Sequence, residues 1–343
     1  MAQSKQDPRM TFECEQYDQY ASLRRLYVLF FFYNDGTVEM IDRTNDKVYL
    51  KRTPTAIPRN AFFLGATVNV LGKPTTITGY ADEVTRQLCE EHSESTVFLI
   101  AESSFVSLGR YISILTEECG FTISDLQMYW VRDEAIAKYD LPQELRNTRV
   151  VLLLGVRAAA MQKGLDFVQR SPGTCTVADT AQLALWKDCL KEARQNPLAV
   201  FDDMNSSVVV IKPHLIQSKR AGNVIQQLVD LDLEPTALAQ VTISSTIADR
   251  FLRPYRGVLP NMDDTLHSLE GNAWVLQLIS LDDSKDVVEV VRAACGPYDT
   301  VVAKKIFPTT IRAKFGINEC DNAVHCCDLP GEGPTYVKFF LKK

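Results

Sequence analysis

Short apolar runs separated by turn residues dominate residues 17–88, a pattern typical of antiparallel strands. The run at residues 27–33 is followed by Asn34-Asp35-Gly36, a strong turn signal, and then by a second run at residues 37–41. Prolines and glycines separate three further runs, at residues 48–50, 66–70 and 75–80. We therefore expect a small antiparallel β domain, either a barrel or a sandwich, within residues 1–90.

From about residue 91 the pattern changes to strands that alternate with helices. Strand-like runs lie at residues 96–101, 124–131 and 150–156, and helical patterns lie at 109–119, 158–170 and 182–194. The same order returns after residue 200, with strands at 207–211, 237–243 and 273–280, and helices at 223–231, 247–252, 264–269 and 286–295. This order predicts two copies of a ferredoxin-like α+β domain, at residues 91–200 and 201–343. The first copy is expected to be truncated, because nothing in it matches residues 309–328.

Composition narrows the class of protein. The chain has 343 residues, of which 46% are hydrophobic and 23% charged, as in ordinary globular proteins of two or three domains. No apolar run is long enough to cross a membrane, and residues 1–8 are polar without the core of a signal peptide. The net charge of −6 argues against nucleic acid as a partner. We therefore expect a protein of the cytoplasm or cytoskeleton whose nine scattered cysteines are reduced.

Candidate chemistry is concentrated after residue 206. Lys212 ends an apolar strand, and Pro213 keeps it extended, so its ammonium is expected to leave the sheet edge and suit a polyphosphate. Arg292 and Arg312 could add forked contacts to phosphate oxygens. His325, close to Asn322, could act as a nucleophile that holds a phosphoryl group on nitrogen. Each of these residues alone has an ordinary explanation as a solvated or structural side chain, so the combination carries the hypothesis.

The cysteines near His325 allow a second interpretation. Cys320, Cys326 and Cys327 could form a zinc site with the imidazole. However, adjacent cysteines suit a tetrahedral site poorly, and no second Cys-x-x-Cys pair is present. Buried thiols beside the pocket are the favoured interpretation, and no metal ligand is assigned.

These residues carry a resemblance to a known family. Thr310-Ile311-Arg312-Ala313-Lys314-Phe315-Gly316 and Asn322-Ala323-Val324-His325-Cys326-Cys327-Asp328 resemble the active-site stretch of nucleoside diphosphate kinases. Val209-Val210-Ile211-Lys212-Pro213-His214 resembles their first strand with its phosphate-binding lysine. Residues 27–42, 50–53 and 64–88 resemble the doublet-microtubule (DM-ten) domain. One such domain before two kinase-like copies resembles the layout of the nucleoside diphosphate kinase homologue 7 family.

The resemblance implies a role for each candidate residue. His325 would accept the phosphoryl group, while Lys212, Arg292 and Arg312 would hold phosphates and Asn322 would bind the sugar. Mg²⁺ would accompany ATP or a nucleoside diphosphate if the site is active.

Several positions depart from the kinase pattern. Leu252 replaces a tyrosine near the phosphate, with Tyr255 three residues later, and Tyr298 replaces a threonine. The glutamate that orients the histidine falls at Tyr336, and Glu332 is too close to His325 in sequence to replace it. The usual Gly-Ser-Asp after the histidine is Cys326-Cys327-Asp328. Since a nucleophile must be held in line, these departures predict weak or absent kinase activity.

The first copy departs further. Ala101 stands where the lysine is expected, Glu102 follows it and would repel a phosphate, and no histidine follows in an Asn-x-x-His context. This copy is predicted to lack kinase chemistry.

Two functions remain open. The resemblance implies a structural protein of ciliary or flagellar axonemes, bound to tubulin and other proteins inside doublet microtubules, with no nucleic-acid or membrane partner. The alternative is an active nucleoside diphosphate kinase that transfers the γ-phosphoryl group of ATP through phospho-His325.

Overall fold

The computed structural model describes residues 8–18, 23–57, 59–62, 66–90, 94–259, 261–282 and 284–342. The polar residues 1–7 lie outside this range. The chain divides into two compact units, Met1–Glu94 and Ser95–Lys343. The three-domain division at residues 1–90, 91–200 and 201–343 stays a prediction, since the last two predicted domains lie together in the second unit.

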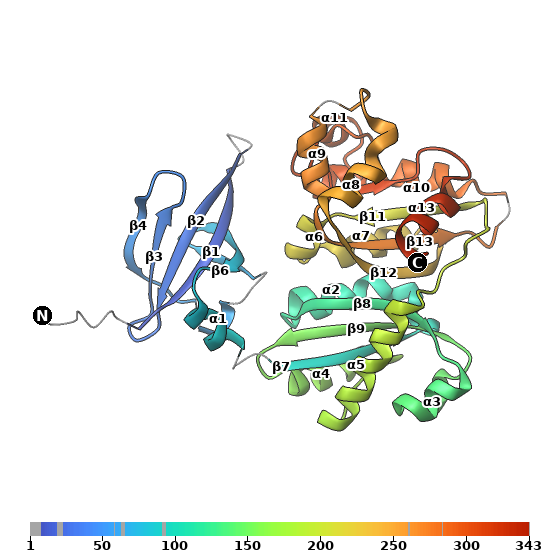
Figure 1. The fold of residues 1–343 in the computed structure, drawn as a ribbon, viewed down its shortest axis with the longest axis horizontal. Helices are drawn as coiled ribbons and strands as arrows, with labels where there is room; N and C mark the ends of the chain where they lie inside the picture. Colours follow the sequence, from blue (N-terminus) through green and yellow to red (C-terminus); the bar gives the residue numbers. More distant parts are fainter. Residues whose placement is uncertain are drawn as a thin grey trace, which may run out of the picture. The chain divides into compact units, whose positions relative to one another are not determined.

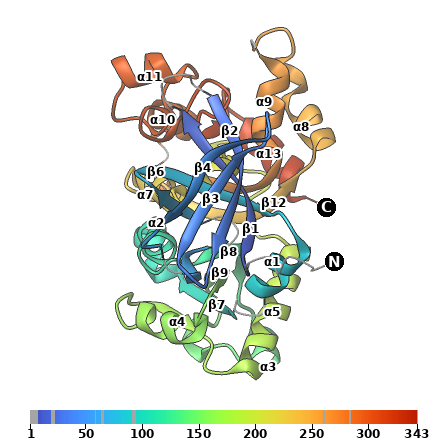
Figure 2. The same cartoon turned by 90° about the vertical axis from the view of Figure 1, so that its left-hand side faces the viewer.

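The N-terminal unit is built on one six-stranded sheet with the order β4-β3-β2-β1-β6-β5. Its elements are β1 Met10–Asp18, β2 Leu23–Phe32, β3 Thr37–Asp42, β4 Lys47–Pro54, β5 Thr67–Val70, β6 Lys73–Tyr80 and helix α1 Glu83–Glu90. Figure 2 shows β1 to β4 as long, twisted strands lying side by side. Strands β4 and β5 are the two edges, so the sheet is open, and the predicted antiparallel β domain is confirmed.

Strand β1 is an element that the sequence prediction missed. Met10, Phe12 and Cys14 are fully buried, while Glu13 and Glu15 between and after them are only partly covered. This alternation is the period of a strand with one face in the core. The strand pairs with both β2 and β6, so it occupies the middle of the sheet.

The second unit is built on one eight-stranded sheet with the order β10-β7-β9-β8-β12-β13-β11-β14. Its strands are β7 Glu94–Ala101, β8 Thr122–Trp130, β9 Arg149–Arg157, β10 Thr174–Thr176, β11 Ser206–Ile211, β12 Glu234–Ile243, β13 Gly271–Ile279 and β14 Val324–Cys326. The helices are α2 Leu108–Ser113, α3 Asp133–Tyr139, α4 Ala160–Val168, α5 Thr180–Gln195, α6 Pro213–Gln217, α7 Ala221–Val229, α8 Ser245–Leu252, α9 Met262–Leu269, α10 Val287–Cys295, α11 Thr300–Ile306, α12 Ile311–Phe315 and α13 Glu332–Leu341. The predicted ferredoxin-like α+β class is confirmed.

The strand order reveals the duplication directly. Counting outward from the middle of the sheet, each half presents its second, third, first and fourth strand in turn. Figure 1 shows β8 and β12 next to each other, with β9 and β7 on one side and β13 and β11 on the other. The halves meet antiparallel at Gln127 and Ala239, and the Gln240 side chain donates across this seam to the Ser124 carbonyl (2.7 Å).

Helices α2 and α7 join the two copies through a pair of glycines. A Cβ on Gly222 would lie 2.6 Å from the carbonyl oxygen of Gly109, and one on Gly109 would overlap the backbone of Gly222 and Gln226. No side chain fits at either position, so the two helix backbones touch. One hydrophobic core therefore contains residues of both copies, for example Phe98 of the first and Trp274 of the second.

The two copies differ in the connection that leads from a helix to their fourth strand. In the first copy, residues 169–173 join α4 to β10, whereas in the second copy residues 296–323, with α11 and α12, join α10 to β14. Strand β10 pairs with β7 as β14 pairs with β11. The expected truncation is therefore confined to this connection, and the first copy does have a counterpart of the fourth strand, contrary to the expectation that nothing matches residues 309–328.

Candidate functional site

Lys212 lies where β11 ends and α6 begins. Its side chain is only 2% exposed, and Nζ donates to Ser268 Oγ (3.1 Å) and to the Cys320 carbonyl. Burial, together with the positive charge of Arg312, lowers the pKa of Lys212 to about 7. The ammonium leaves the strand where expected, but α9 and the loop around Cys320 cover it.

His325 lies on the same face of the sheet as Lys212. It pairs with Val210 in the β11–β14 ladder, and side chains two residues apart on a strand share a face. Phe251, Tyr255 and Tyr336 surround the imidazole, with ring centroids 4.9 to 5.7 Å away. Burial among these rings and the charges of Arg312 and Lys212 lower the pKa of His325 to about 3. The imidazole is therefore neutral over the physiological pH range.

Arg312 enters the site from α12. Its guanidinium donates to the carbonyls of Gly296 (2.6 Å) and Val324 (3.1 Å), the residue before His325. Its Nε is buried without a hydrogen-bond partner among the described residues. Lys212, Arg312 and His325 thus converge as predicted, although their roles in binding or catalysis stay predictions.

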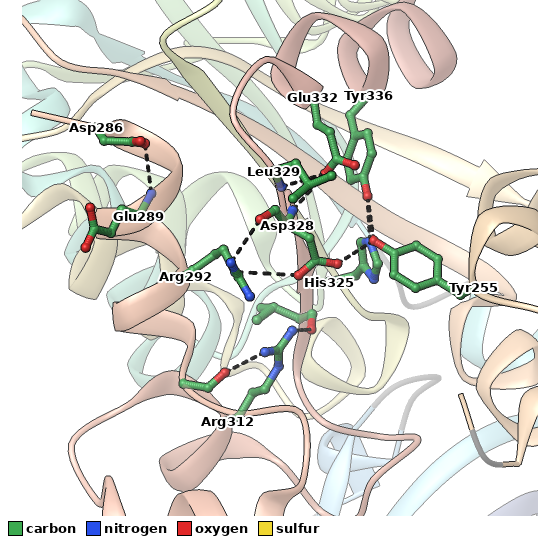
Figure 3. Close-up of polar contacts among 12 residues, drawn as sticks. Tyr255, Asp286, Glu289, Arg292, Arg312, His325, Asp328, Leu329, Glu332 and Tyr336 are labelled. Carbon is green, nitrogen blue, oxygen red and sulfur yellow. Dashed lines mark hydrogen bonds and ion pairs between the residues drawn. The ribbon is translucent and has the colours of Figure 1, made fainter. Parts of the chain in front are cut away.

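A chain of hydrogen bonds leads away from the imidazole (Figure 3). Nε2 of His325 lies 3.1 Å from the Tyr336 hydroxyl, which lies 3.1 Å from the Tyr255 hydroxyl. The Tyr255 hydroxyl donates to Asp328 Oδ2 (2.5 Å). The sequence analysis noted Tyr336 as a departure from the kinase pattern, Tyr255 as a tyrosine close to Leu252, and Asp328 as part of the active-site stretch. It did not connect the three residues, and the fold brings them together.

Arg292 and Glu332 hold Asp328 from its other sides. Arg292 Nη1 donates to the Asp328 carbonyl (2.9 Å), and its Nε lies 3.6 Å from Asp328 Oδ1. The Glu332 carboxylate accepts from the backbone N–H groups of Asp328 (2.8 Å) and Leu329 (3.1 Å). Arg292 is therefore at the rim of the site, engaged with Asp328, and its predicted phosphate contact would require it to leave this partner.

Asn322 is buried in the loop before His325. Its Nδ2 donates to the Tyr298 carbonyl (3.3 Å), while its Oδ1 is buried without a partner among the described residues. A buried polar atom without a partner is uncommon and suits a site that awaits a polar ligand. The sugar-binding role of Asn322 stays a prediction.

The backbone between Asn322 and His325 is strained. Ala323 is fully buried with φ of +78°, in the left-handed region that favours glycine. Such strain is often found where a loop positions a functional side chain.

Two of the departures leave the pocket without a polar group that is free for phosphate. Leu252 is fully buried in the core beside His325's aromatic neighbours, and the Tyr298 hydroxyl lies 3.1 Å from Thr265 Oγ1. Neither residue supplies a group that the described residues leave free for phosphate.

Among its described residues, the first copy has no comparable site. In the first copy, Cys175 occupies the ladder position that His325 occupies in the second. Cys175 pairs with Leu99, two residues before Ala101, just as His325 pairs with Val210, two residues before Lys212. The Glu102 carboxylate accepts hydrogen bonds from Arg149, including one from the backbone N–H (2.7 Å) and one from Nε of the guanidinium (2.9 Å). Arg149 also pairs with Glu234 on β12 of the second copy. The carboxylate expected to repel phosphate is therefore part of an ion-pair cluster that joins the copies.

Cys326 and Cys327 belong to the packed core, whereas Cys320 is only partly buried. All nine cysteines are free, and a hydrogen bond from Cys295, which outweighs burial, lowers the pKa of Cys326 to about 7. Within the described ranges, no group of three or more His, Cys, Asp or Glu residues is arranged to hold a metal ion. In the same ranges no helix is long and apolar enough to cross a membrane.

Comparison with known proteins finds relatives of this chain. The family model "Nucleoside diphosphate kinase" matches residues 205–343. The "Nucleoside diphosphate kinase homolog 7" of Rattus norvegicus is 26% identical over 379 residues, covering 100% of this chain and 95% of the relative. That of Mus musculus is 28% identical over 382 residues, with the same coverage. Over its whole length the chain is therefore a relative of the nucleoside diphosphate kinase homolog 7 proteins, and its residues 205–343 match the nucleoside diphosphate kinase model.

Single-copy kinases match only one part of this chain. The nucleoside diphosphate kinase of Aquifex aeolicus is 24% identical over 135 residues, covering 39% of this chain and 92% of the kinase. A crystal structure of the Aquifex aeolicus enzyme aligns with a TM-score of 0.36 at 23% identity, over 39% of this chain and 92% of that one.

Proposed function

We propose that this chain is a structural protein of ciliary or flagellar axonemes, located inside doublet microtubules and built on a nucleoside diphosphate kinase scaffold. One observation carries the proposal. The first copy keeps its four strands and its core, yet it has Ala101 and Cys175 where the second copy has Lys212 and His325. A copy kept without its chemistry contributes packing and surface rather than turnover.

The N-terminal unit supports the same role. Much of its sheet is formed by residues that resemble the DM-ten domain, a resemblance that implies tubulin and other doublet proteins as partners. A protein with this role would lie in the cytoskeleton of the cilium.

Extraction of axonemes tests this role. Cilia from cells that produce the full-length tagged chain are demembranated and washed in high salt, and the chain is followed by immunoblotting. We expect it to stay with the doublets, like tubulin, while a soluble matrix protein in the same sample is released. Release of the chain with the matrix fraction would contradict the structural role.

A second function, phosphoryl transfer at the C-terminal copy, is favoured by one specific arrangement. A neutral imidazole lies on the same face as the buried side chain of Lys212, and the positive charge of Arg312 also acts on it, which suits attack on an anionic phosphate. A ring nitrogen of His325 would bond to the γ-phosphorus of magnesium-bound ATP, and the diphosphate would leave with the electron pair of the broken P–O bond. A second nucleoside diphosphate would then take the phosphoryl group and restore the imidazole.

Labelling with γ-³²P-ATP tests this second function. We expect an acid-labile label on the wild-type chain and none on His325→Ala. His267→Ala is the matched control, because the side chain of His267 is 85% exposed on α9. Equal labelling of the His325→Ala and wild-type chains would exclude the phospho-His325 mechanism.

A further inference from the structure

The hydrogen-bond chain beyond His325 has a direction that can be worked out from its far end. Asp328 ends the chain, and its carboxylate can only accept, so the Tyr255 hydroxyl donates its single proton to Oδ2. The Tyr255 oxygen is then left as an acceptor for the Tyr336 hydroxyl, 3.1 Å away. Tyr336 in turn has no proton left for the imidazole, so its oxygen accepts from Nε2 of His325 at 3.1 Å.

This order decides which nitrogen of His325 carries the proton. A neutral imidazole has one N–H, and the chain requires it on Nε2. Nδ1 then holds a lone pair, and among the described residues it has no hydrogen-bond partner. The pKa of Tyr336 agrees with this order. Burial is the main cause that raises this pKa far above its usual value, and the hydrogen bond to Tyr255 is the next.

We infer that Asp328 is the positioning residue of this site and that it acts on His325 through Tyr255 and Tyr336. Tyr336 stands where the family has its orienting glutamate. The carboxylate that serves His325 here is that of Asp328, which two hydrogen bonds connect to Tyr336. The inference rests on the proposed phosphoryl transfer, for which it names Nδ1 as the attacking atom. The Nδ1 lone pair forms the N–P bond, the P–O bond to the leaving diphosphate breaks, and the proton stays on Nε2 throughout.

The surroundings hold this chain in place. Arg292 and Glu332 fix Asp328 through its carbonyl, carboxylate and backbone N–H. Phe251 packs edge-on against both His325 and Tyr336, with ring centroids 4.9 Å apart in each case. In such an apolar setting, hydrogen bonds in series polarise one another, so the Asp328 charge is felt at the imidazole as it becomes positive on attack.

Nuclear magnetic resonance of the imidazole nitrogens tests the inference on the full chain. Long-range ¹H–¹⁵N spectra of the ¹⁵N-histidine-labelled protein report the tautomer, and His325→Ala identifies the signals. We expect the Nε2–H form in the wild type. In Tyr255→Phe, the Tyr336 hydroxyl loses its acceptor and turns to Nε2, so we expect a shift to the Nδ1–H form.

Two more variants separate this effect from general damage. In Asp328→Asn the amide can donate to Tyr255, which reverses the chain, so the tautomer should again move towards Nδ1–H. Tyr139→Phe is the matched control, because the Tyr139 hydroxyl donates to Glu192 Oε2 (2.5 Å) in the first copy. It should leave the His325 signals and the labelling unchanged. We expect phosphoenzyme formation to fall on the order of a hundredfold in Tyr255→Phe and Asp328→Asn.

The outcomes distinguish this inference from the proposed function. An Nδ1–H wild type, or an unchanged tautomer in Tyr255→Phe, would overturn the role of Asp328 even if His325 is labelled. If the tautomer shifts as expected but the wild type takes no label, the positioning by Asp328 stands and the phosphoryl transfer is wrong. A tautomer shift together with loss of label supports both.

Discussion

The two kinase-like copies share a sheet plan and differ in the one connection that would carry the site. Each copy places its fourth strand beside its first, and this strand brings Cys175 to one edge of the sheet and His325 to the other. Only the second copy has residues 296–323, which supply Arg312 and Asn322. The comparison teaches that the core can survive without the site, because the alternation of apolar residues in the strands does not depend on this connection.

The two copies also differ in whether their buried or half-buried cations are paired with carboxylates. The second copy buries Lys212 near Arg312, at a cost in stability that a phosphate ligand would offset. The first copy pairs its charges, with Arg149 held between Glu102 and Glu234. Removing a cation should therefore have opposite effects on stability in the two copies.

The largest effect should come from breaking the contact between the copies. Gly222→Val places methyl groups against the carbonyl of Gly109, so we expect the free energy of unfolding to fall by about 3 kcal/mol in urea. Gly164→Ala is a control within a helix of one copy, where a Cβ would lie 3.2 Å from a Phe98 ring atom. It should change stability by no more than about 1 kcal/mol. Independent unfolding of two copies in the wild type would contradict this picture of one shared core.

Removal of the buried cation in the second copy should stabilise the protein without ligand. Lys212→Met keeps the shape of the side chain and removes a desolvated charge, so we expect a gain of about 2 kcal/mol at pH 7. Lys212 loses its proton near pH 7 when folded but near its ordinary value of 10.5 when unfolded. Between these values the unfolded chain binds more protons, so this residue makes the wild type gain stability as the pH rises.

The difference between Lys212→Met and the wild type should therefore shrink from pH 7 to pH 9.5 in urea unfolding. The variant should also lose binding of magnesium-bound nucleotide, measured by calorimetry. A variant less stable than the wild type at pH 7 would show that Lys212 is held for stability and not for a ligand.

Removal of the paired cation in the first copy should have the opposite sign. Arg149→Met leaves Glu102 and Glu234 half-buried without their partner, and we expect a loss of about 1.5 kcal/mol. Lys191→Met, which breaks an exposed pair with Asp188, is the control and should change stability by less than about 0.5 kcal/mol. An equal effect of the two substitutions would mean that the cluster between the copies contributes no more than a surface pair.

The smallest effect should appear in the strained loop before His325. Ala323→Gly relieves the positive φ but removes a buried methyl group, so we expect a net gain of about 0.5 kcal/mol. Ala303→Gly in the interior of α11 is the control, and it should lose about 1 kcal/mol or more. A loss of stability in Ala323→Gly would indicate that packing of the methyl group outweighs the strain.

Much of the fold was predictable because strands and helices have distinct apolar periods. The runs that predict β7, β8 and β9 return in β11, β12 and β13, so the duplication is visible in the chain itself. Strand β10 was missed because three residues are too few to show a period, and β1 was missed although Met10, Phe12 and Cys14 do show one. Lys212, Arg312 and His325 could be named from residue type and spacing, but the link between Tyr255 and Asp328 could not be foreseen. Nothing local connects residues 73 positions apart.

By itself, the sequence determined the class of each domain, the duplication, and the residues that mark one copy as a candidate site and the other as empty. Those properties follow from side-chain type and from short-range periodicity, which the chain carries locally. Only the tertiary structure decided that the copies share one sheet and core, that Cys175 stands in the place of His325, and that Asp328 reaches the imidazole through two tyrosines. These depend on strand register and on the close approach of helices, which are set when distant segments pack together.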